Sequence, residues 1–131
     1  MKRLFLTLML SYLSSVAMAG SWGEGSFDND DALDWVAKCI QTSNTTVVST
    51  TIEAALKSPF IEAPEGSEAV AAIEVVAAAM GKPNPKIPSE ISTWLEHQPK
   101  SDLIKLATHA LLALERIKDP KTSELSQLWS E

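Results

Sequence analysis

The chain has 131 residues, of which 45% are hydrophobic and 21% are charged, a composition typical of a globular protein rather than a disordered one. Its formal net charge is −6 at pH 7. This sign disfavours binding to nucleic acid or to anionic lipid, which requires clustered Lys and Arg, and it favours a basic partner.

The first nineteen residues have the layout of a secretory signal. Lys2 and Arg3 precede an apolar stretch over residues 4–13, and Ala17-Met18-Ala19 forms a small-x-small ending before Gly20. An apolar stretch of about ten residues is too short for a membrane anchor, which needs roughly 20. We therefore expect cleavage after Ala19, a periplasmic or secreted protein without a membrane anchor, and one mature domain over residues 20–131. Without Lys2 and Arg3, nine basic residues stand against 17 acidic ones, a formal charge of −8.

The mature chain begins with an irregular Gly/Trp-rich lead-in over residues 20–27, with turns expected at Gly23 and Gly25. Asp28 or Asn29 is predicted to cap a first helix that fades near Thr42. Its expected apolar face consists of Leu33, Val36, Ala37 and Ile40.

Residues 43–58 are ambiguous between strand and helix, because residues 45–52 are β-branched except for Ser49. A helix is favoured, since no second strand is available to pair with this segment. The helical stripe would consist of Val48, Ile52, Ala55 and Leu56.

Residues 65–80 predict the central helix of the fold, because apolar side chains occupy nearly every direction around its axis. Pro59 and Pro64 are expected to bracket the loop before it, Ser67 to cap it, and Gly81 to end it. Further helices are predicted over residues 89–97, 101–118 and about 125–129, with His109 and Arg116 on the polar side of the second. The predicted fold class is all-α, a small single-domain bundle of about five to six helices.

No motif predicts a catalytic residue, a metal or a cofactor. A phosphate-binding turn before the first helix is contradicted by the carboxylates around it. Asp28 and Asp30 match the first two ligand positions of a Ca²⁺ loop, but Ala32 and Leu33 stand where a ligand and a Gly are needed.

Two single side chains, Cys39 and Glu74, stand out in the sequence as candidates for a structural or a functional role. Cys39 is the only cysteine, so no intrachain disulfide forms, and a small buried side chain is expected. Glu74 lies midway along the apolar helix, where a carboxylate is costly unless it is paired or near the surface. We expect a structural pair with Lys or Arg or a rim position, and the functional alternative is a polar group in a cleft.

The opening of the mature chain, GSWGEGSFDNDDALDW over residues 20–35, resembles that of a bacterial family known as domain of unknown function 4259. Members of that family typically start G-x-W-G-x-G-x-F-x-N-D-D-A-x-D, mostly directly after Met. Residues 71–78 resemble the alanine-rich helix of the family, and residues 123–129 resemble its closing segment. The resemblance implies the fold and a boundary at Gly20, and it implies no catalytic role.

Three hypotheses about function follow. The first is a non-catalytic binding protein, such as an immunity-type inhibitor that covers a cationic toxin or hydrolase, working as a monomer or small oligomer. The second is an enzyme with a non-contiguous polar site around Glu74 and His109. The third is an envelope protein with a structural or small-ligand role. In the first hypothesis the partner-binding residues are Asp28, Asp30, Asp31, Asp34, Glu62, Glu65 and Glu68.

Overall fold

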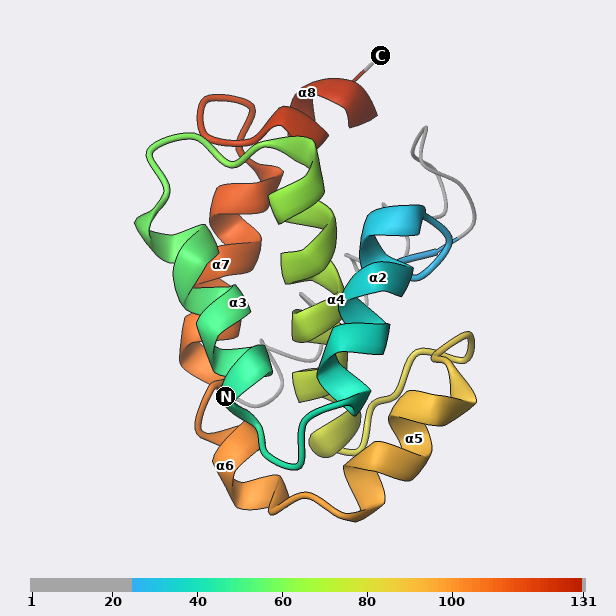
Figure 1. Cartoon of the computed structure of the whole chain (residues 1–131). Coiled ribbons are helices and arrows are strands. Elements are labelled where there is room, and N and C mark those ends of the chain that lie inside the picture. The colour runs from blue at the N-terminus through green and yellow to red at the C-terminus, as the bar shows by residue number, and fades with distance from the viewer. Residues whose placement is uncertain (1–24, 131) are drawn as a thin grey trace.

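The computed structural model describes residues 25–130, which form seven helices and confirm the all-α fold class (Figure 1). The predicted signal over residues 1–19 and the lead-in residues 20–24 lie outside the described residues. None of the helices in this range is long and apolar enough to span a membrane. The helices are α2 (Asp30–Ile40), α3 (Thr46–Lys57), α4 (Ala63–Ala79), α5 (Ser89–Glu96), α6 (Lys100–Ile104), α7 (Ala107–Lys118) and α8 (Glu124–Trp129).

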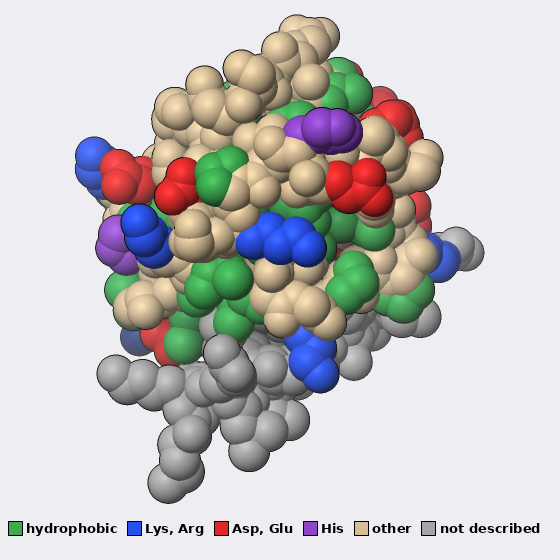
Figure 2. Space-filling model, turned by 90° about the horizontal axis from the view of Figure 1, so that it is seen from below, with side chains coloured by type: hydrophobic (Ala, Val, Ile, Leu, Met, Phe, Trp, Pro, Cys, Tyr) green, Lys and Arg blue, Asp and Glu red, His purple; other side chains and the backbone are tan. Residues whose placement is uncertain are grey.

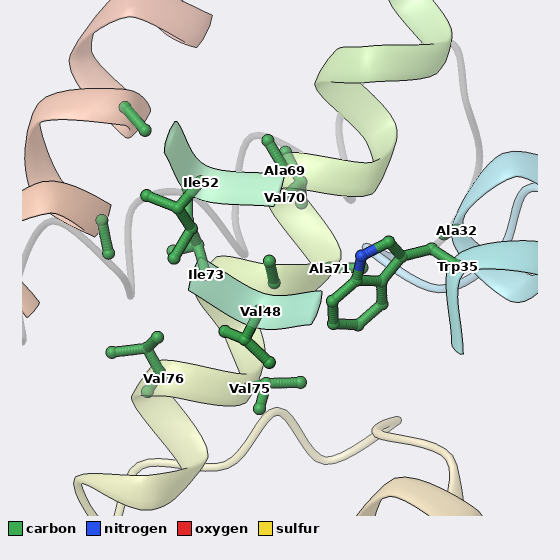
Figure 3. Packing of buried hydrophobic residues seen from close by; sticks show 14 of the residues in the cluster. Ala32, Trp35, Val48, Ile52, Ala69, Val70, Ala71, Ile73, Val75 and Val76 are labelled. Carbon is green, nitrogen blue, oxygen red and sulfur yellow. The ribbon is translucent and has the colours of Figure 1, made fainter. Parts of the chain in front are cut away.

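Helix α4 is the centre of the bundle, as predicted. It contacts α2, α3, α6, α7 and α8, and in Figure 1 it lies between α3 and α2. Side chains on all its faces are buried, and Figure 3 shows those of Ile73, Val75 and Val76 among residues from α3. The many alanines keep α4 thin, so neighbouring helices approach it closely from several directions at once.

The predicted start of α4 is wrong. Ser67 is buried inside the helix rather than capping it, and the helix begins at Ala63 with Pro64 in its first turn. Two carboxylates make this start stable. The backbone N–H of Ala63 donates to Glu124 Oε1 (2.7 Å), and that of Glu62 donates to Glu65 Oε1 (3.4 Å), while a proline has no N–H to satisfy.

The predicted end of α4 is confirmed at Gly81, whose φ is +88°. Glycine adopts this left-handed conformation without the strain that a side chain would cause. The N–H of Lys82 donates to the carbonyl of Ala77 at 2.9 Å, which closes the helix in a Schellman-type turn.

Helix α2 begins as predicted but buries a different face. Asn29 caps it by accepting a hydrogen bond from the N–H of Ala32 at 2.9 Å. Leu33 is 47% exposed and Ala37 is exposed, so their predicted burial is wrong. The bulky Trp35 decides the rotation of the helix, because its ring is buried and its Nε1 donates to Thr51 Oγ1 on α3 at 2.7 Å. The buried side chains of α2 are those of Ala32, Trp35, Val36 and Cys39.

The other helices match the predictions except over residues 101–118. Helices α3 and α5 form as expected, and the predicted single helix is instead divided into α6 and α7. The N–H of Leu106 bonds to the carbonyl of Leu103 at 3.0 Å, and ψ at Leu106 is −3°, so the chain tightens and turns between the two helices.

Arg116 was expected on the polar face of its helix, and this is wrong. Its guanidinium is half-buried and donates to the backbone carbonyls of Ala55 and, at 2.5 Å, Ser58. These carbonyls belong to the last turn of α3 and the residue after it, where a helix leaves acceptors without internal partners. Arg116 therefore fastens α7 to the end of α3.

The loop before α4 and the loop before α8 are joined. Ile61 forms a parallel β-bridge with Ser123, through hydrogen bonds of 2.8 Å to Thr122 and 2.9 Å from Glu124. This bridge holds α8 in contact with the first turns of α4. There the backbone of α4 approaches α8 closely: a Cβ atom at Gly66 would lie 2.7 Å from Leu125 Cδ1, so the buried Leu125 side chain would have to shift.

The change Gly66→Ala tests this close approach. Alanine is better than glycine in a helix by about 1 kcal/mol, yet the added methyl group would overlap Leu125, so we expect a net loss of about 1–2 kcal/mol in urea unfolding. In a Leu125→Ala background the same change is expected to stabilise the protein. Stabilisation of equal size in both backgrounds would contradict the packing described.

The change Arg116→Met tests the connection between α7 and α3. It retains an apolar stem and removes both hydrogen bonds, so we expect the free energy of unfolding to fall by about 2 kcal/mol. Lys121→Met, at an exposed lysine, is the control and is expected to change stability by less than about 0.5 kcal/mol. If the two variants lose the same stability, the guanidinium does not fasten the helices.

Candidate functional site

Charge is distributed unevenly along the described chain. Nine acidic and two basic residues lie between Asp28 and Glu74, whereas six acidic and seven basic residues lie between Val75 and Ser130. Figure 2 shows the lower end of the molecule, where basic, acidic and histidine side chains are interspersed. Within the described residues, the net negative charge is therefore carried mainly by α2 and α4, since Glu53 and Lys57 of α3 cancel.

Four of the seven predicted partner-binding acids are brought together by the fold. Asp31 and Asp34 of α2 and Glu65 of α4 all raise the pKa of Glu68, although burial of its carboxyl is the larger cause and Lys38 acts in the opposite direction. These four carboxylates, Asp31, Asp34, Glu65 and Glu68, are called the acid cluster below. Two helices about thirty positions apart in the sequence thus form one negative surface.

The remaining three predicted acids are exposed but do not act on Glu68. Asp28 follows a turn closed by its own N–H and the carbonyl of Gly25 at 3.2 Å, as the sequence predicted for Gly25. Asp30 opens α2, and Glu62 is the N-cap residue of α4. They lie at the N-terminal ends of the same two helices, where negative side chains are favourable.

A groove of about 300 Å³ adjoins the acid cluster. Lys38 lines it from α2, Glu65 and Glu68 line it from α4, and one face of α3 supplies the rest. The α3 residues are Thr46, Val47, Thr50, Thr51, Ala54 and Ala55.

The groove exists because α3 presents small side chains to solvent beside α2 and α4. Thr46, Thr50 and Ala54 follow one another at a spacing of four, so they lie on one face of the helix. The bond from Trp35 Nε1 to Thr51 fixes α2 against α3 below this face, and Thr51 in turn donates to the carbonyl of Val47 at 2.7 Å. This groove was not predicted from the sequence, and the small residues spaced i, i+4, i+8 along α3 were the available signal.

The burial and the hydrogen-bond partners of Glu74 differ from those predicted. Its side chain is 2% exposed, so it is not at a rim, and its partners in the described part of the chain are neutral rather than Lys or Arg. Ser26 Oγ donates to Glu74 Oε2 at 2.8 Å, and Asn84 Nδ2 donates to the same oxygen. Glu74 thereby ties the segment before α2 and the connector after α4 to the middle of α4.

The other candidates for chemistry form no hydrogen bond with Glu74 in the described part of the chain. His109 is exposed on α7, and it is not among the hydrogen-bond partners of Glu74. Cys39 is fully buried, as predicted, and burial raises the pKa of its thiol to about 12, which disfavours the nucleophilic thiolate. Among residues 25–130, no three His, Cys, Asp or Glu side chains converge as metal ligands would.

Together these features define a small all-α domain with a groove of mixed polar and apolar lining beside an acidic surface. The chain belongs to the family described as domain of unknown function (DUF4259), whose model matches residues 20–131. The resemblance read from the opening residues is thereby confirmed at the level of the family. No curated protein and no solved structure matches the chain.

Glu74→Gln is expected to change how stability depends on pH. Burial raises the pKa of Glu74 more than the hydrogen bonds from Asn84 and Ser26 lower it. The folded state then binds more protons than the unfolded state between the ordinary glutamate pKa and the raised one, so stability falls as pH rises through this window. Gln accepts the same two hydrogen bonds without ionising.

The free energy of unfolding of the Gln variant, relative to the unchanged protein, should therefore increase with pH when measured in urea from about pH 4 to about pH 8. Glu96→Gln, at an exposed glutamate of α5, is the control and should follow the unchanged protein. A constant difference between Glu74→Gln and the unchanged protein across this range would show that Glu74 has an ordinary pKa.

Proposed function

We propose that the protein is an exported, non-catalytic binding module that captures a basic protein partner through the acid cluster. Its concrete form is an immunity-type inhibitor, which covers a cationic toxin or hydrolase in the periplasm. Capture by charge needs a surface and no reactive group, in keeping with the exposed position of His109 and the buried thiol of Cys39.

The observation that carries this proposal is the convergence of carboxylates from α2 and α4: Asp31, Asp34 and Glu65 all act on Glu68. Within residues 25–130, Lys38 is the cation that acts on Glu68, whereas three carboxylates act on it with the opposite effect. Like charges held this close repel one another, and a basic partner relieves the repulsion on binding. The same negative field accelerates the approach of that partner.

Export is supported by two readings of the sequence that select the same residue. The secretory layout predicts cleavage before Gly20, and the family match also begins at Gly20. A periplasmic location gives the acidic surface access to secreted basic proteins.

Neutralising the acid cluster is the test. The variant Asp31→Asn/Asp34→Asn/Glu65→Gln/Glu68→Gln should lose a partner that the unchanged protein captures from its native envelope. Affinity for the purified partner, measured by calorimetry, should fall by about 100-fold or more, since close interfacial charge pairs each contribute about 1 kcal/mol or more. The affinity of the unchanged protein should also fall with added salt.

A matched control removes the same number of charges elsewhere. Glu90, Glu96, Asp102 and Glu115 are exposed, and changing them to Gln or Asn should leave affinity within about threefold of that of the unchanged protein. If both variants lose affinity equally, the effect is due to net charge and not to the acid cluster. If affinity for the partner changes with neither salt nor either variant, the proposal is refuted. If the partner is a hydrolase, its activity should fall on binding.

A further inference from the structure

Building on the proposed function, we propose that the groove between α2, α3 and α4 receives one arginine side chain of the basic partner. The acid cluster attracts the partner as a whole, and the groove selects the residue that anchors it. The size of the groove, its apolar side chains and the carboxylates that line it point to this occupant.

The size and lining of the groove suit a single long side chain. A volume of about 300 Å³ is at the lower limit of the pockets that hold small-molecule ligands. Its lining includes the methyl groups of Val47, Ala54 and Ala55, against which an aliphatic stem loses its contact with water. Arginine and lysine both have such a stem and bury it while their charged end stays near polar groups.

The edge of the groove supplies acceptors for a cationic end. Glu65 and Glu68 are three positions apart on α4, so their carboxylates lie on the same face of the helix. The hydroxyl of Thr50, exposed on α3, is a further acceptor across the groove. Two carboxylates and a hydroxyl beside apolar side chains match the five N–H donors of a guanidinium group.

Arginine fits these groups better than lysine. A planar guanidinium forms hydrogen bonds in several directions at once, and it is less strongly hydrated than an ammonium group, so it loses less on entering a half-buried site. Glu68 is half-buried, so a cation that pairs with it must lose part of its hydration, and this favours the weakly hydrated guanidinium.

The helix directions set the orientation of the side chain. Helix α3 runs antiparallel to α2 and α4 (Figure 1), so Ala54 lies towards the Glu65 end of the groove and Thr46 towards the Lys38 end. The guanidinium belongs at the Glu65 end, because the ammonium group of Lys38 already acts on Glu68. The partner backbone then crosses the groove near Thr46.

The probe for this proposal is the peptide acetyl-Gly-Ser-Arg-Ser-Gly-amide, compared with peptides in which citrulline or lysine replaces the arginine. Citrulline has the shape of arginine without its charge. In NMR titrations at low salt, the arginine peptide should shift backbone amide signals of α3 between Thr46 and Ala55 and of α4 around Glu65 and Glu68. The lysine peptide should bind several-fold more weakly, and the citrulline peptide should give no shifts.

Two alanine variants separate the groove from the charged surface. Ala54→Leu fills the groove without changing any charge and should weaken binding of the arginine peptide by about tenfold. Ala37→Leu adds the same bulk at an exposed position of α2 that does not line the groove, and should leave binding unchanged. Unchanged urea unfolding in both variants shows that neither acts through stability.

The outcomes distinguish this inference from the proposed function. Equal binding of the lysine or citrulline peptide, shifts spread over all acidic side chains, or full binding by Ala54→Leu would each overturn the arginine site. If Ala54→Leu still captures the envelope partner while the neutralised acid cluster does not, the proposed function stands and the groove is not its anchor. If neutralising the acid cluster has no effect on capture, the proposed function itself fails.

Discussion

The structure depends on the burial of α4 on all its sides. A helix with apolar side chains in every direction is stable in water only when other helices surround it, and α2, α3, α6, α7 and α8 do so here. Each of them has one buried face against α4 and an opposite face towards solvent. The positions of the acid cluster and of the groove follow from this arrangement, because α2 and α3 must lie side by side on the same helix.

The polar groups of the interior serve to hold this arrangement in place. Trp35 joins α2 to α3, Arg116 joins α7 to the end of α3, and Glu74 accepts hydrogen bonds from segments on both sides of α4. Each of these groups satisfies a donor or acceptor that would otherwise be buried without a partner. Their part in function is indirect, since they fix the helices that carry the exposed carboxylates.

Local patterns predicted much of the fold, and contacts between distant residues did not follow from them. The apolar period of α4, the Asn29 cap and the Gly81 end depend on neighbours within a few positions, and all are present. The start of α4 depends on Glu124, far along the chain, so the nearer Ser67 was a wrong choice. The buried face of α2 was predicted wrongly because two apolar faces, one with Leu33 and one with Trp35, are both compatible with helical spacing. At the candidate site, the acids were predicted, but the groove was not, since three helices contribute to it.

The uneven distribution of charge has a consequence for how the molecule moves before it touches anything. Nine acidic residues stand against two basic ones between Asp28 and Glu74, and the charges after Glu74 nearly balance. We therefore expect the folded domain to have an electric dipole moment in addition to its net charge. In the field of a positively charged surface such a body experiences a torque as well as an attraction. Such a torque would turn α2 and the beginning of α4 towards that surface, and fewer encounters would be lost to unproductive orientations.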